Sequence, residues 1–142
     1  MVIKMWALFA LLSALFSSIM LVLIKVGLKN LDSDLGLAIR TIIVTVFCII
    51  NVLIIGKIKD IKNIDGKVWL WLLLGSIATY LTWLFYFKAT KQGEAMNVIA
   101  ISQMSIVFSL VLNFFFLKEK ISIMDILGSL IVILGVYLIV YK

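Results

Sequence analysis

Two cationic side chains lie within apolar stretches of this sequence. Lys25 ends the first stretch, and Arg40 stands five residues into the second. A cation at the centre of a bilayer costs about 2.5–3.5 kcal/mol on insertion scales. Either both side chains extend to lipid headgroups, or Arg40, with or without Lys25, faces a water-filled vestibule and attracts an anionic group. If the two cations instead pair with Asp32 and Asp34 in the intervening segment, their role is structural.

A stripe of polar residues runs along a later apolar stretch. Ser102, Ser105, Ser109 and Asn113 recur at offsets of 0, 3, 7 and 11, which places them on one face of a helix. Gln103 lies about 100° around that helix from Ser102. These groups either hydrogen-bond neighbouring helices, for about 0.6–2 kcal/mol, or line a cavity.

Three further features are candidates for a substrate cavity or for ion coupling. Ser13 and Ser17 belong to a small-residue face that suits close packing or a cavity wall. Trp83 and Tyr86 belong to an aromatic cluster that either holds apolar parts of a substrate or lies at the membrane interface. Asp125, near the start of the last apolar stretch, is either interfacial or a proton-coupling carboxylate.

Residues for most catalytic chemistries are missing. The sequence has no His, a single cysteine (Cys48) and no Walker-type glycine loop. No pair of carboxylates, Ser–His pair or metal-type cluster falls within the apolar stretches. We therefore predict no catalytic residue, no cofactor and no metal site, and we expect a protein that binds and conducts rather than an enzyme.

The composition places these residues in a membrane. Hydrophobic residues make up 65 % of the 142 residues and charged residues 14 %, against roughly 45–50 % and 25 % in soluble domains. A globule of this length leaves much of its surface exposed and cannot hide so much apolar area. The excess must face lipid.

Five stretches are long enough to cross a bilayer, which needs about 20 mostly apolar residues. We predict an all-α integral membrane protein with a single domain over residues 1–142. The first stretch is expected to be a retained helix rather than a cleaved signal peptide. The predicted spans are 5–24, 36–56, 68–87, 96–117 and 121–141.

The basic residues between the spans bear on orientation. An odd number of spans puts the two termini on opposite sides of the membrane. Seven basic residues fall on the N-terminal side and six on the other, so the positive-inside bias is weak. The chain then inserts with its N-terminus in the cytoplasm, or it inserts both ways. The seven are Lys4, Lys57, Lys59, Lys62, Lys67, Lys118 and Lys120; the six are Lys25, Lys29, Arg40, Lys88, Lys91 and Lys142.

The net charge of +6 does not indicate nucleic-acid binding, because the charges lie between apolar runs rather than on one amphipathic face. We expect them to meet anionic lipid headgroups of the cell (inner) membrane.

With five spans in place, the chain resembles a single EamA-type domain of the drug/metabolite transporter superfamily. The resemblance covers nearly the whole length and rests on the order and spacing of several short pieces. These are Lys25–Gly27, DSDLGLAIRT over 32–41, WLFYFKATKQGEA over 83–95, LKEK over 117–120 and LGSLIVILGVYL over 127–138. Relatives carry Pro, Asp and Lys early in the fourth span, where this chain has Ala100, Ser102 and Gln103. The missing proline removes an expected bend, and the missing charges put charge-based coupling there in doubt.

The resemblance implies one half of an inverted-repeat transporter, with substrate between two halves near the midplane. A lone half recovers that geometry as an antiparallel homodimer, or as a heterodimer with a second half. We expect it to carry small organic metabolites or drugs. Two alternatives stay open: a subunit of a lipid-linked sugar or lipid flippase, and a non-transporting membrane scaffold in which the polar stripes only join helices.

Overall fold

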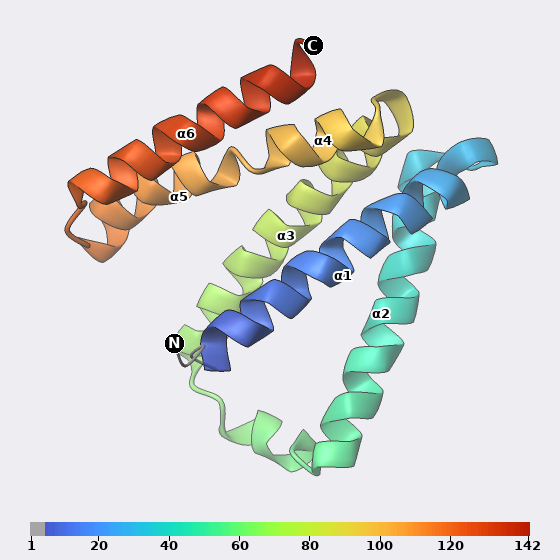
Figure 1. Ribbon diagram of the computed structural model, residues 1–142. Helices are drawn as coiled ribbons and strands as arrows, with labels where there is room; N and C mark the ends of the chain where they lie inside the picture. Colours follow the sequence, from blue (N-terminus) through green and yellow to red (C-terminus); the bar gives the residue numbers. More distant parts are fainter. Residues whose placement is uncertain (1–4) are drawn as a thin grey trace. The chain divides into compact units, whose positions relative to one another are not determined.

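The computed structural model describes residues 5–142 (Figure 1). Lys4, one of the charges used in the orientation argument, lies outside these residues. The described part of the chain contains helices and short connections and no strand. The α-helices are α1 Met5–Gly27, α2 Ser33–Ile55, α3 Gly66–Gln92, α4 Ala95–Ser102, α5 Ser105–Leu112 and α6 Ile123–Val140.

Within residues 5–142, five helical segments are long and apolar enough to cross a membrane, and α4 and α5 together form one of them. This confirms the predicted all-α fold with five membrane helices. The segments overlap the five predicted spans but differ at their ends. The largest difference is at α3, which continues to Gln92 through residues that we expected in a connection from Lys88 to Ala95. Lys88 and Lys91 therefore project from a helix.

The helix ends follow local sequence signals. Asp32 caps the N-terminus of α2, and Gly56 ends that helix with φ of +74°, a left-handed conformation that glycine adopts without strain. At α6, the Ser122 hydroxyl accepts from the Met124 N–H and the Asp125 carboxylate accepts from the Ser122 N–H, which forms a capping box.

The chain divides into two compact units. The central unit is Ile24–Gln92, which contains the end of α1 and the whole of α2 and α3. The terminal unit consists of two separate pieces of the chain, the part up to Leu23 and the part Gly93–Lys142. In the central unit α2 contacts α3, and Leu28, Leu37 and Phe87 are buried. In the terminal unit α6 contacts both α4 and α5.

The fourth span is not one regular helix. The backbone N–H groups of Met104, Ile106 and Val107 donate to carbonyls three residues back, at 3.0 Å, so the chain winds as a short 3₁₀ segment between α4 and α5. The Ser102 hydroxyl adds a bond to the Ile99 carbonyl at 2.7 Å. Our expectation that the missing proline would remove a bend was therefore wrong, because 3₁₀ winding interrupts the helix without one.

One glycine in the central unit is required by close packing. A Cβ on Gly36 would lie 2.5 Å from Cδ2 of Leu28 and 3.8 Å from a ring carbon of Phe87. Both neighbours are buried, so neither can move aside freely. Gly75, on α3, has open space around its Cβ position.

We expect Gly36→Val to lower the stability of the folded protein by about 1–3 kcal/mol, the usual cost of overpacking. Gly75→Val is the matched control and should change it little. Thermal unfolding in detergent, followed by size-exclusion fluorescence, measures both. Equal melting temperatures for the two variants would contradict the packing described here.

Candidate functional site

Lys25 binds the C-terminal end of α3 within the central unit. Its Nζ donates to the carbonyl oxygens of Thr90 at 2.8 Å and Lys91 at 3.4 Å. The last carbonyls of a helix have no partner within the helix, and a lysine supplies both donors and a favourable charge there. Lys91 in turn donates to the Leu31 carbonyl at 2.6 Å. These bonds join the end of α1, the segment before α2 and the end of α3.

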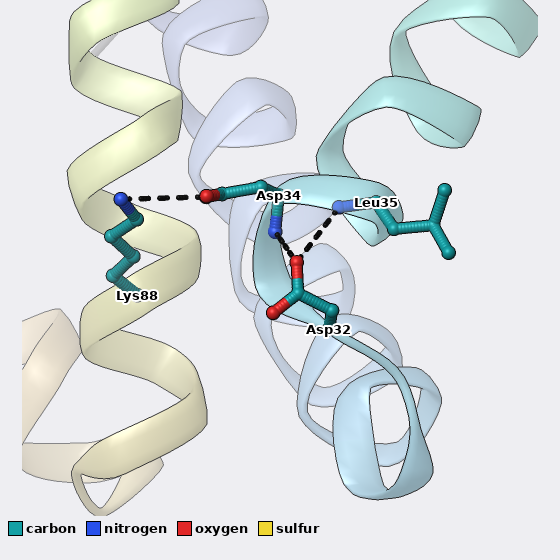
Figure 2. Close-up of polar contacts among 4 residues, drawn as sticks. All are labelled: Asp32, Asp34, Leu35 and Lys88. Carbon is teal, nitrogen blue, oxygen red and sulfur yellow. Dashed lines mark hydrogen bonds and ion pairs between the residues drawn. The ribbon is translucent and has the colours of Figure 1, made fainter.

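The two carboxylates proposed as partners for Lys25 and Arg40 make other contacts. Asp34 forms an ion pair with Lys88 at 3.5 Å, and the Asp32 carboxylate accepts from the backbone N–H groups of Asp34 and Leu35 at 2.9 and 3.2 Å (Figure 2). Asp34 thus links the first turn of α2 to α3, while Asp32 caps the N-terminus of α2.

Asp32 lies in the connection before α2, outside the membrane-spanning helices. Hydrogen bonds from the Leu35 and Asp34 N–H groups lower the pKa of its carboxyl below the ordinary value, because they favour the ionised form. The charge of Lys91 lowers that pKa further.

Arg40 lies beside aromatic side chains of α3. Its guanidinium carbon is 4.5 Å from the ring centre of Trp83 and 5.7 Å from that of Phe87, within the range of cation–π attraction. Arg40 and Tyr86 are half-buried. The structure thus gathers four predicted site residues, Lys25, Arg40, Trp83 and Tyr86, in the central unit.

Trp83 also borders a small cavity in the central unit. This cavity has a volume of about 280 Å³ and is lined by α2 side chains including Thr41, Thr45 and Cys48. Both threonine hydroxyls donate to carbonyls of α2 itself. The cavity walls are therefore mostly apolar.

A larger cavity lies in the terminal unit, between α5, the hairpin after it and α6. Its volume is about 620 Å³. Ser105, Ser109 and Asn113 line it from the α5 side, and Gly128 and Ser129 line it from α6. The hairpin and the start of α6 add the charged side chains Glu119, Lys120 and Asp125.

The break in the fourth span divides the predicted polar stripe. Ser105 lines the cavity and Ser102 and Gln103 do not, although all three are exposed. On α1, Ser13 and Ser17 are also exposed. These four residues and the two cavity members Ser105 and Asp125 belong to the terminal unit.

The sequence-based list omitted Ser109, Asn113 and Ser129 from the site, although Ser109 and Asn113 continue the stripe from Ser105. The four-residue spacing of Ser105, Ser109 and Asn113 was the available signal for the first two. Thr90, which is fully buried, had no signal in the sequence. Among residues 5–142, no group of three or more His, Cys, Asp or Glu side chains is placed to hold a metal ion.

Comparison with known proteins identifies the family. Residues 4–141 match the EamA-like transporter family. The chain belongs to this family. It is also similar to the "Uncharacterized transporter in cobO 3'region" from Sinorhizobium sp, with 36 % identity over 135 residues and 94 % of each chain covered. No solved structure matches the chain.

Family membership makes this EamA-family chain a multi-pass membrane transporter. Several pieces of sequence that carry the family resemblance lie in the central unit. Three of the five pieces that carry the resemblance, Lys25–Gly27, 32–41 and 83–95, supply the residues that bond or stack there. These residues lie in the central unit, whereas the pieces 117–120 and 127–138 belong to the terminal unit.

Replacing Lys25 by Met should destabilise the protein by about 1.5–3 kcal/mol, the usual contribution of hydrogen bonds to a charged group. The replacement leaves the α3 terminal carbonyls without their cationic donor. Lys29→Met removes an exposed charge from the next turn of the chain and is the control. Thermal unfolding in detergent compares them, and a Lys29→Met variant as unstable as Lys25→Met would contradict the assigned role.

Low pH should lower the stability that the Asp32 cap gives to the N-terminal end of α2. Because the folded pKa of Asp32 is lowered, its ionised form stabilises the fold above the ordinary Asp pKa, and that stabilisation is lost as pH falls through the lowered value. Asp32→Asn keeps a capping side chain without titrating. We expect the variant to lose less stability than the parent between pH 7 and pH values below about 4. Superimposable pH–stability curves would contradict this assignment.

Proposed function

We propose that this chain is a half-size transporter that moves small organic metabolites across the cell (inner) membrane as an antiparallel dimer. The observation that carries the proposal is an odd number of membrane helices in a chain that matches its family almost end to end. The Sinorhizobium protein, named as a transporter, aligns over 94 % of its own length, which supports the transporter part of the proposal.

The odd number has a geometric consequence for a fused protein, because a second five-helix repeat then inserts with the opposite orientation. Two separate copies reach the same arrangement when they insert in opposite orientations and are related by a two-fold axis in the membrane plane, which is the symmetry of inverted-repeat transporters. Substrate then binds between the copies near the midplane, and rocking of one copy against the other alternates access. The nearly even distribution of basic residues supports insertion in both orientations.

The described contacts separate structural charges from candidate transport residues. Lys25 is committed to the α3 carbonyls and Asp34 to Lys88. Arg40 on Trp83, with Tyr86 near it in α3, is the proposed anion-attracting part of the pathway. Asp125 stands at the other cavity, where its carboxylate caps α6, and it is the candidate for proton coupling.

Reporters fused after Lys142 test the antiparallel arrangement. One reporter is active only in the cytoplasm and the other only outside it. We expect both fusions to be active, because seven basic residues against six give almost no preference.

Lys59→Gln with Lys62→Gln is the matched topology control, since it changes the balance to five against six and spares the Lys57–Asp60 ion pair. It should raise the cytoplasmic signal and lower the other. A single active reporter in the parent chain would contradict the homodimer.

A further inference from the structure

The cavity of about 280 Å³ in the central unit follows one face of α2. Its residues on that helix recur every three or four positions, which places them on one face. They are Thr41, Val44, Thr45, Cys48, Ile49 and Val52. With a rise of about 1.5 Å per residue, this face is about 16 Å long. Trp83 lines the cavity from α3, and we call the cavity the α2–α3 groove.

A 3₁₀ segment borders the Val52 end of the groove. This segment, η2 Ile58–Asn63, lies in the connection from α2 to α3 (Figure 1). Residues three apart share a face in a 3₁₀ helix. Ile58 and Ile61 share one face and line the groove, whereas Lys59 and Lys62 share another face and are exposed. The segment is therefore amphipathic.

Lys59 and Lys62 carry charges that no acidic side chain neutralises by contact. The adjacent Lys57 forms an ion pair with Asp60 at 3.3 Å, and within residues 5–142 Lys59 and Lys62 form no ion pair. An apolar groove that ends beside exposed cations is complementary to an anionic phospholipid. The acyl chain of such a lipid avoids water, and its phosphate attracts lysine.

The dimensions of the groove suit a single acyl chain. The hydrocarbon core of a bilayer is about 30 Å thick, so a chain in one leaflet reaches about 15 Å, close to the length of the groove. A volume of about 280 Å³ spread over that length leaves a width of about 4–5 Å, slightly more than the contact distance between two carbon atoms. An α-helix, about 10–12 Å across with its side chains, is too wide to enter.

The groove offers little to a polar ligand. The Thr41 and Thr45 hydroxyls already donate to carbonyls of their own helix, at 2.8 and 2.9 Å. Arg40 stacks on Trp83 but does not line the groove. The nearest exposed cations at the η2 end are therefore those that follow the groove in the sequence, Lys59 and Lys62.

We propose that the α2–α3 groove holds one acyl chain of an anionic phospholipid, whose headgroup is bound by Lys59 and Lys62. The lipid is a bound partner of the central unit and not a transported molecule. The proposal therefore goes beyond the proposed function and depends neither on transport nor on a second copy. It places η2 at the level of the headgroups, with its isoleucines toward the hydrocarbon.

Trp83 provides the test, because it lines the groove. Trp6, Trp69 and Trp71 are exposed and are replaced by Phe in the full chain. The protein is placed in phosphatidylcholine nanodiscs that contain a small fraction of a phospholipid brominated in mid-chain, which quenches tryptophan fluorescence on contact. We expect brominated phosphatidylglycerol to reach half-maximal quenching at an about ten-fold lower mole fraction than brominated phosphatidylcholine, because its net negative charge attracts the lysines.

Equal quenching curves for the two lipids would overturn the proposal and indicate contact with bulk lipid alone. Absence of quenching by either lipid would also overturn it and indicate that protein, from this chain or a second copy, covers the groove.

Paired variants test the two parts of the site. Lys59→Gln with Lys62→Gln should make the two quenching curves coincide, whereas Lys118→Gln with Lys120→Gln, which removes two exposed lysines of the terminal unit, should leave them apart. A difference that survives the loss of Lys59 and Lys62 would contradict the headgroup assignment.

Thr45→Phe fills the groove and should reduce quenching by both lipids. Thr79→Phe is the matched control, because the Thr79 hydroxyl also donates to a carbonyl four residues back and the residue lies outside the groove. Equal quenching in these two variants would contradict an acyl chain in the groove.

If the variant with three Phe replacements does not fold, as judged by size exclusion, thermal unfolding of the parent chain in detergent tests the same binding. Added phosphatidylglycerol should raise the melting temperature more than the same amount of phosphatidylcholine, because a ligand that binds only the folded state stabilises it. The Lys59→Gln, Lys62→Gln variant should lose this difference. An equal rise with both lipids in the parent chain would overturn the proposal.

Discussion

A chain segment in lipid has no water to bond with, so its polar groups must find partners inside the protein. The structure of this transporter follows from that constraint. Its apolar stretches form helices, several helix hydroxyls such as that of Thr79 bond back onto their own backbone, and Lys25 donates to the end of α3, where carbonyls lack helical partners. Ser105 and Ser109 line a cavity.

The same constraint changes how the charged residues are interpreted. In a transporter sequence, a cation next to an apolar span suggests substrate binding. Here Lys25 and Lys91 bond to backbone carbonyls, and Lys88 pairs with Asp34. These contacts join helix ends in the central unit, and Arg40 stacks on Trp83. Charges that look alike in the sequence thus make different contacts in the structure.

The five membrane helices were predictable because length and apolar composition suffice to define a span. The acceptors of Lys25 were not, because backbone carbonyls carry no sequence signal. The break near Gln103 was missed because a proline was expected as its cause, whereas 3₁₀ hydrogen bonding produces it. Ser105 lines the cavity and Ser102, on the other side of the break, does not.

As a transporter, this chain alone should move a small polar molecule across a membrane. Counterflow into proteoliposomes containing only the purified chain tests it most directly. Vesicles are preloaded with unlabelled L-serine or glycine betaine and then exposed to the labelled compound. We expect transient accumulation above the level of protein-free vesicles. Accumulation indistinguishable from that level for both compounds would contradict transport by this chain.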